Sequence, residues 1–178
     1  ADIVIMYNDL QGQNIWAFTF GSSNRDVVSR VIRDSEDKII VTGYTLINNE
    51  KKVFIAKIDI TNGQIEWSKK FGPGVPTDMI NINNEGSIAI NSIGYAVCGY
   101  SGDQAFVIYT DVNGNISGTN WAYYYRINDS NLKFTSLIQL KTKGIYINTS
   151  FAFRNYLVLS GYNNNGAYTA KIDLTSGN

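Results

Sequence analysis

Hydrophobic and polar positions alternate along this chain in short runs, which are separated by turns rich in Asn, Asp and Gly. Alternation with a period of two over stretches of this length is typical of strands that bury one face. In the first part, strands are predicted at residues 3–9, 14–21, 27–34, 38–45, 53–60 and 64–72.

The same order of strands is predicted again after residue 72, in a looser form. A Gly-Pro loop at 71–76 should precede a weak strand at 87–92. The strands expected after it are 95–101, 105–112, 120–127, 136–142, 144–151 and 167–174, with residues 152–159 as an insertion. Gly-Tyr pairs at 43/44, 99/100 and 161/162 are expected at the entrance to a turn.

Residues 53–72 form a unit that returns at a spacing of about 50 residues, as in propellers, solenoids and arrays. In this unit an Asp ends one strand, a Gly lies in the turn that follows, and a Trp begins the return strand. Asp should cap a tight turn, Gly should take its left-handed position, and Trp should be buried between neighbouring sheets. The repeated positions are Asp59, Asp111, Asp173, Gly12, Gly63, Gly114, Trp16, Trp67 and Trp121.

Strand order and repeat length together predict an all-β fold, a β-propeller-like array of four-stranded antiparallel meanders. The chain holds about three and a half repeats, so the propeller would be partial or open; a β-solenoid-like array is the alternative. We expect one β-repeat domain, 1–178. Its parts are the end of one blade (1–21), two blades (22–72 and 73–126) and a degenerate, incomplete blade (127–178).

The pattern W-x-x-x-FG, followed by IIVTGYT and FIAKIDITNG, resembles tandem β-propeller repeats of secreted and surface proteins. The spacing of Asp59, Gly63 and Trp67 is distantly similar to the tryptophan-docking repeats of quinoprotein-like propellers. The similarity covers essentially the whole chain and is best kept in residues 15–72. It implies a propeller fold and an extracellular or cell-surface location, but little about function, because propellers host enzymes, receptors and scaffolds alike.

Composition argues against several classes of function. Basic and acidic residues balance at 15 each, so nucleic acid is not an expected partner. Histidine is absent, and Cys98 lies in an apolar run typical of a buried small residue, so we expect no enzyme and no cofactor. A carboxylate pair, Asp26 and Asp78, is better explained as loop caps. No apolar run is long enough to span a membrane.

The turns contain two further candidate sites. Residues 111–117 offer oxygens from Asp111, Asn113 and Asn115, but lack the Gly and Glu of a calcium loop, so no metal is expected there. Sequons begin at Asn115, Asn128 and Asn148, and turn exposure favours glycan on the first two over the third.

These observations predict a non-catalytic structural or protein-interaction propeller module. The alternatives are a fragment of a propeller enzyme, quinoprotein-like or acting on polysaccharide, and a carbohydrate-binding module that uses Tyr123, Tyr124 and Tyr125. Since the sequence opens in mid-blade and stops before a return strand, we expect its ends to be completed by further blades of a longer chain or by self-association into an assembly or filament.

Overall fold

The computed structural model describes residues 2–21, 23–35, 37–83, 92–116, 120–126, 131–142, 146–147, 150–151 and 154–174. All regular elements in these residues are strands, and the strands pair antiparallel. The all-β prediction is therefore confirmed. The chain divides into two compact units, Ala1–Pro76 and Thr77–Asn178.

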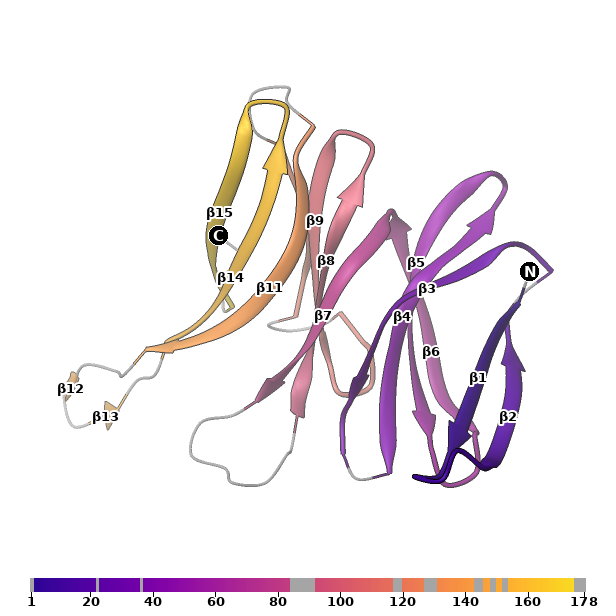
Figure 1. Cartoon of the computed structure of the whole chain (residues 1–178). Coiled ribbons are helices and arrows are strands. Elements are labelled where there is room, and N and C mark those ends of the chain that lie inside the picture. Colours follow the sequence, from indigo (N-terminus) through magenta and orange to yellow (C-terminus); the bar gives the residue numbers. More distant parts are fainter. Residues whose placement is uncertain are drawn as a thin grey trace. The chain divides into compact units, whose positions relative to one another are not determined.

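The first unit contains a hairpin and a four-stranded sheet (Figure 1). The hairpin consists of β1 (Ile3–Asn8) and β2 (Asn14–Phe20). The sheet follows chain order, with β3 (Asp26–Arg33), β4 (Lys38–Ile47), β5 (Glu50–Asp59) and β6 (Ile65–Pro73). Asn48 and Asn49 join β4 to β5 at positive φ, as a two-residue hairpin turn requires.

One face of the hairpin packs on this sheet. Ile3 is buried with Val41, Phe54 and Ile58, and the rings of Phe18 and Phe20 pack against the same cluster. Phe20 meets Phe54 edge-on, with ring centroids 5.4 Å apart. The alternation of the hairpin strands thus places one set of side chains in the core and leaves the other set outside.

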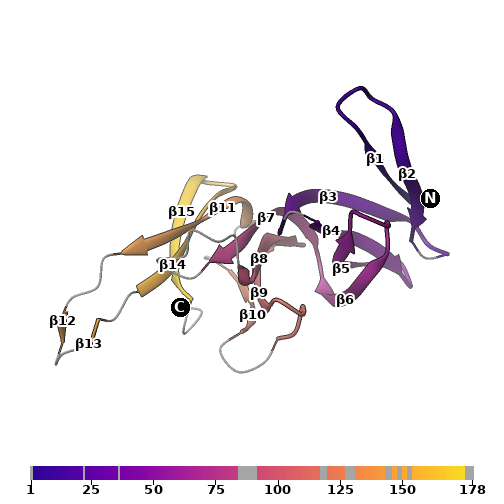
Figure 2. The same ribbon diagram turned by 90° about the horizontal axis from the view of Figure 1, so that it is seen from below.

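The second unit contains a four-stranded and a three-stranded sheet, which lie beside each other in Figures 1 and 2. The first has β7 (Val75–Asn83), β8 (Ser92–Ser101), β9 (Gln104–Asp111) and β10 (Ala122–Tyr125). The second has the order β11 (Lys133–Thr142), β14 (Arg154–Asn163), β15 (Gly166–Asp173). A small hairpin, β12 (Tyr146–Ile147) and β13 (Ser150–Phe151), stands between β11 and β14 in the chain.

The two larger sheets of this unit share one apolar core. Val107 and Trp121 contribute to it from the first sheet, and Leu157, Leu159 and Ile172 contribute from the second. The three larger sheets of the chain occupy residues 26–73, 75–125 and 133–173, against predicted blades at 22–72, 73–126 and 127–178. That these form a single domain stays a prediction.

The outer strand β7 of the four-stranded sheet in the second unit differs from the prediction. β6 continues to Pro73 and β7 begins at Val75, so the expected Gly-Pro loop shrinks to Gly74. The apolar signal in β7 is carried by Met79 and Ile82, which are fully buried. Proline is tolerated near the ends of outer strands, but in a sequence it argues against a strand. The prolines here therefore favour a loop over the strand that the structure has. The predicted weak strand at 87–92 lies outside the described residues except for its last residue, which begins β8.

The last sheet corrects a second prediction. Its central strand is β14, which includes most of the segment 152–159 that was expected to be an insertion. The Gly-Tyr pairs also lie within strands, and not at turns. A Cβ on Gly43 would stand 2.0 Å from the Val27 carbonyl oxygen, and one on Gly161 would stand 2.1 Å from that of Lys133. Both glycines face a register shift in the neighbouring strand, which brings its backbone too close for a side chain.

Three turns share one way of closing. The N–H groups of Asp9, Asp59 and Asp111 donate to the carbonyl oxygens of Gln13, Gln64 and Asn115, at 2.9 to 3.0 Å. Each aspartate side chain also accepts from the backbone N–H two residues later. Gly12, Gly63 and Gly114 have φ of 81°, 72° and 74°. Asp therefore caps the turn and Gly supplies the left-handed residue, although the turn of Asp59 is one residue longer.

Two of the repeated tryptophans, Trp16 and Trp121, bind the backbone of a neighbouring sheet. The indole N–H of Trp16 donates to the Ile60 carbonyl oxygen at 2.5 Å, and that of Trp121 donates to the Leu174 carbonyl oxygen at 3.1 Å. Ile60 and Leu174 both follow the tetrapeptide Ala-Lys-Ile-Asp, so the two contacts are equivalent in the repeat. Trp121 is buried, with 7% of its surface exposed, whereas Trp16 and Trp67 are half-buried.

Gly63 serves both the turn and the tryptophan. A Cβ on Gly63 would meet Trp16 and Phe18 at 3.2 to 3.3 Å, whereas one on Gly12 would meet nothing within 4 Å. We expect Gly12→Ala to cost about 1 to 2 kcal/mol from backbone strain alone. Gly63→Ala should cost more, because it also displaces the indole. Urea unfolding of both variants tests this, and equal losses would contradict a docking role for Gly63.

Removing the Trp121 indole should destabilise the second unit strongly. We expect Trp121→Ala to lower the free energy of unfolding by about 3 to 5 kcal/mol, because a large buried side chain is lost. Trp121→Phe keeps most of the packing and should lose less, including about 1 kcal/mol for the hydrogen bond to Leu174. Denaturant unfolding followed by circular dichroism measures both. A loss below about 1 kcal/mol for Trp121→Ala would contradict the docking role.

Candidate protein-interaction site

The outer edge of β15 is one of the open sheet edges among the described residues of the second unit. β15 ends its sheet, and within the described residues no strand pairs with its outer side. Its counterpart in the first unit, β5, is paired on both sides, with β4 and with β6. The tetrapeptide Ala-Lys-Ile-Asp occurs at 56–59 and at 170–173, so the positions of the two strands can be matched residue by residue.

A pocket of about 260 Å³ lies beside this edge. Side chains of successive strand residues point to opposite faces, so consecutive residues can line one pocket only where it borders the edge of the strand. The lining residues are Tyr168 to Ile172 of β15, together with Tyr125, Arg126, Leu132 and Phe134. Rings and aliphatic groups thus form one wall, and the strand edge forms the other.

A similar pocket in the first unit shows what is missing beside β15. It measures about 220 Å³ and has Phe20, Phe54, Ser68 and Lys70 among its lining residues. Phe54 corresponds to Tyr168 in the repeat, whereas Ser68 and Lys70 belong to β6. In the first unit, residues of β6, which pairs with β5, therefore line the pocket. In the second unit β15 borders the corresponding space.

The repeat also gives the direction of the β15 backbone. The Asp59 N–H points out of β5 toward the next strand, where it donates to the Gln64 carbonyl oxygen. The N–H groups of alternate residues point to the same side of a strand. Because Asp173 matches Asp59, the N–H groups of Lys171 and Thr169 point away from β14. They are the donors that an added strand would meet.

The pocket beside this edge is lined by two basic residues, Arg126 and Lys171, and by no carboxylate. Lys171 is exposed, and its ammonium lies 3.8 Å from the centroid of the Tyr156 ring. Arg126 forms an ion pair with Asp103. The charged residues of β15 itself are Lys171 and Asp173.

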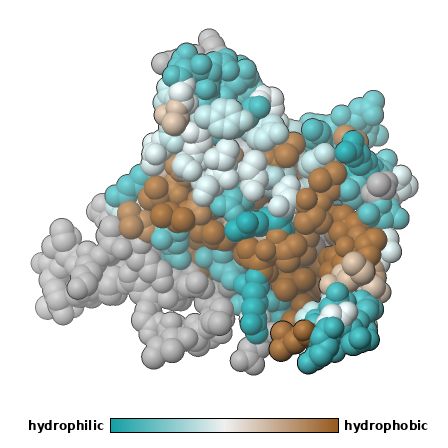
Figure 3. Space-filling view, viewed as in Figure 1, coloured by the Kyte–Doolittle hydropathy of each residue, from teal (hydrophilic) through white to brown (hydrophobic). Residues whose placement is uncertain are grey.

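The hairpin β1–β2 carries an apolar outer face. Val4, Met6 and Ile15 are 60%, 64% and 54% exposed, while the opposite face is packed on the sheet. Figure 3 shows hydrophobic side chains over the strands of this hairpin, and Leu10 in its turn is fully exposed as well. Neither of its strands has a second strand neighbour among the described residues. Exposed apolar side chains next to open strand edges are features of interaction surfaces.

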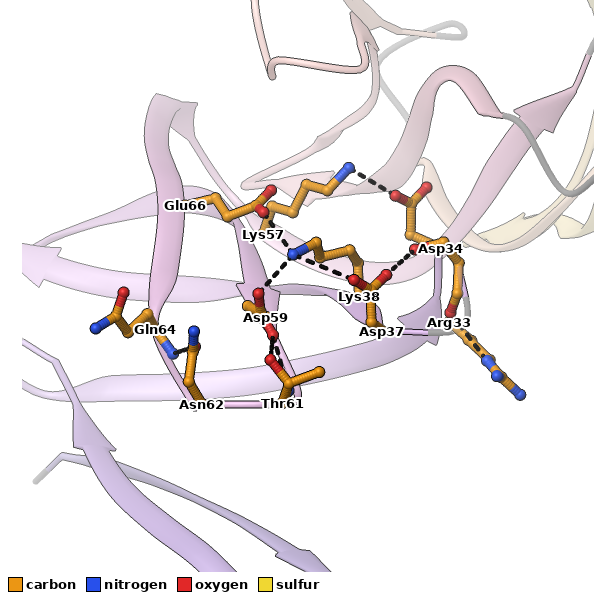
Figure 4. A network of polar contacts seen from close by, with 11 residues as sticks. Arg33, Asp34, Asp37, Lys38, Lys57, Asp59, Thr61, Asn62, Gln64 and Glu66 are labelled. Atoms are coloured by element: carbon orange, nitrogen blue, oxygen red, sulfur yellow. Dashed lines mark hydrogen bonds and ion pairs between the residues drawn. The ribbon is translucent and has the colours of Figure 1, made fainter.

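A polar network joins the strands of the first unit (Figure 4). The Lys38 ammonium lies 2.6 Å from Asp59 and 2.8 Å from Glu66, and Lys57 lies 2.7 Å from the buried Asp34. The hydrogen bonds to Asp59 and then to Glu66 raise the pKa of Lys38. These carboxylates contact lysines on neighbouring strands, so the network has a structural explanation.

Cys98 has the environment of an inert thiol. It is fully buried in β8, with the Thr77 hydroxyl 3.6 Å from its sulfur. Burial raises the pKa of Cys98 to about 12. Because the thiolate is the reactive form, this residue is a poor nucleophile at neutral pH.

The two aspartates considered as a catalytic pair lie in different units. Asp78 accepts hydrogen bonds from the N–H groups of Met79 and Leu137, at 2.9 and 3.1 Å, and so ties β7 to β11. Asp26 is buried at the start of β3 and lines the pocket of the first unit. Asp78 thus joins two strands, which is more than the expected cap of a loop.

The three consecutive tyrosines do not form one platform. Tyr123 and Tyr125 share a face with Trp121, with ring centroids 5.3 and 6.4 Å apart along the row. Tyr124 points to the other face and meets Phe106 at 5.8 Å. The row of rings that a sugar could meet therefore includes the buried Trp121 and leaves out Tyr124.

The turn considered for calcium uses its carboxylate internally. The Asp111 side chain accepts from the backbone N–H groups of Asn113 and Asn115, both at 2.8 Å. Asn115 is exposed, and its side-chain amide donates to Asp111 at 3.2 Å. The sequon positions Asn128 and Asn148 lie outside the described residues.

Comparisons with known proteins assign no family. No protein-family model matches the chain, and no curated protein matches it. In the part of the chain that the structure describes, no three His, Cys, Asp or Glu side chains group so that they could hold a metal ion. Among the same residues, none forms a helix of the length and apolarity needed to cross a membrane.

The Lys38 contact makes the first unit sensitive to acid. The hydrogen bond from Lys38, followed by that from Thr61, lowers the pKa of Asp59 from 3.8 to about 2. Since the folded pKa is the lower one, the stabilisation is present above the ordinary pKa and is lost as the pH falls from 3.8 toward about 2. A carboxyl titration by NMR measures this directly. Lys38→Gln should raise the pKa of Asp59, and an unchanged value would contradict the assigned cause.

Proposed function

We propose that this chain is a non-catalytic, protein-binding module of a secreted or cell-surface protein, whose sheets are blades of a partial or open β-propeller. The observation that carries the proposal is the open edge of β15, bordered by an apolar pocket of about 260 Å³. Addition of a strand to an open sheet edge is a common way of binding an extended protein segment, since backbone hydrogen bonds give affinity and adjacent pockets give specificity.

The propeller arrangement is supported by the equivalence of the two tryptophan contacts. In each unit, an indole on one sheet donates to the backbone just after the third strand of a meander-like sheet. A repeated contact between consecutive sheets allows blades to be stacked at a constant angle. Tight, capped turns keep each sheet compact and leave strand edges and faces as the surfaces that a partner can reach.

The residues of this site favour protein binding over the enzyme and carbohydrate alternatives. The pocket lining contains backbone, rings, aliphatic groups, Arg126 and Lys171, without a carboxylate. The row of aromatic rings on β10 continues to Trp121, which is buried in the core. An extended polypeptide would use both the open strand edge and the apolar pocket beside it. A catalytic site or a carbohydrate-binding site would use only some of these features.

A peptide taken from the chain itself can test strand addition. A synthetic peptide with the sequence of β6 (residues 65–73) should bind at β15, because β6 pairs with the matching strand β5. Fluorescence anisotropy of the labelled peptide against the whole chain measures binding, and a scrambled peptide is the control. Binding of the scrambled peptide with equal affinity, or no binding of either, would contradict the proposal.

Thr169→Pro supplies the matched variant for the same experiment. Proline removes an N–H that points away from β14, so the sheet keeps its own hydrogen bonds while the added strand loses one. Thr169→Ala retains this N–H and is the control. We expect weaker peptide binding by at least several-fold for proline, and an affinity close to that of the wild type for alanine.

A further inference from the structure

We propose that the strand donor is the β1–β2 hairpin of a second copy of this chain, whose β1 adds to the edge of β15. This inference rests on the proposed function and names the partner of the same site. It predicts a contact between the first unit of one molecule and the second unit of another.

The apolar surfaces of donor and acceptor match. The inner face of the hairpin is already packed on its own sheet, so only the outer face is available for a partner. On β1 this face presents Val4 and Met6, which are 60% and 64% exposed. Alternate side chains of a strand added to β15 would face the pocket beside it, where Tyr125 and Phe134 lie. Val4 and Met6 would thereby leave water.

The charges of the two elements are complementary. Residues 2–21 contain Asp2 and Asp9, one on each side of β1, and no Lys or Arg. The acceptor pocket is lined by Arg126 and Lys171 and by no carboxylate, although β15 itself also carries Asp173. The net charge of the chain is zero, so two copies do not repel each other as a whole.

Charge also selects head-to-tail pairing over symmetric pairing. Two β15 edges brought together would bring two pockets lined by Arg126 and Lys171 side by side, and two β1 edges would bring acidic ends together. Pairing β1 with β15 joins opposite charges. Because donor and acceptor are different surfaces, each added copy offers a new edge, and association continues into an open chain of molecules.

Sedimentation velocity of the whole chain, from micromolar to millimolar concentration, tests this directly. At low salt the wild type should form species larger than the monomer, in an amount that grows with protein concentration. Added salt should reduce them, because it screens the charges at the contact. A wild type that remains monomeric at all concentrations would overturn the inference.

Variants identify the two surfaces. Met6→Lys changes an exposed side chain of the donor, and Ile138→Lys is its matched control on an exposed position of β11, 57% exposed. Thr169→Pro changes the acceptor. We expect Met6→Lys and Thr169→Pro each to abolish self-association, and Ile138→Lys to leave it unchanged. An equal loss for Ile138→Lys and Met6→Lys would overturn the assignment of the donor face.

Mixing the two blocked variants gives the sharpest result. Met6→Lys retains an intact acceptor and Thr169→Pro retains an intact donor, so the mixture should form one-to-one dimers and nothing larger. No association in the mixture would contradict head-to-tail pairing. Circular dichroism checks that each variant is folded. If Thr169→Pro unfolds, the comparison of Met6→Lys with Ile138→Lys still decides the donor.

The peptide experiment separates this inference from the proposed function. Binding of the β6 peptide by a chain that does not self-associate would leave the protein-binding function in place and reject the second copy as partner. Failure of both peptide binding and self-association would reject both.

Discussion

The contact between a tryptophan and the backbone of the neighbouring sheet is the interaction on which the rest of this structure depends. A two-stranded hairpin is only marginally stable by itself, and a sheet with one apolar face must pack that face against another element. In both units an indole crosses from one sheet to the next and donates to the residue after Ala-Lys-Ile-Asp. The ring supplies packing and the N–H fixes the register, so one residue type sets both the distance and the alignment of two sheets.

This contact explains why the turn residues are constrained beyond the needs of the turn. Gly63 adopts a positive φ, and it also leaves room for Trp16 to lie against the turn. Asp59 caps the same turn and bonds to Lys38, which reaches Glu66 on β6. Packing between sheets and pairing within a sheet are therefore linked at this turn.

The candidate site is formed by the same repeat that forms the sheets. Each sheet of the repeat has an inner strand that should be paired on both sides, and in β5 this is so, whereas β15 has one described neighbour. An edge of this kind keeps the hydrogen-bonding donors and the apolar pocket that a paired strand would cover. The surface proposed for binding is thus a part of the repeat itself, namely the strand edge that has no second neighbour among the described residues.

The sequence by itself determined the local features: most strands, the capped turns at Asp9, Asp59 and Asp111, and the inert character of Cys98. These follow from alternation, from turn chemistry and from composition, which act over a few residues. Only the tertiary structure decided that residues 75–83 are an outer strand, that β14 is a central strand, and that Gly43 and Gly161 face a register shift. It also revealed the pocket beside β15 and the partners of Trp16 and Trp121. These features depend on which strands become neighbours, and pairing between residues far apart in the chain leaves no local pattern to read.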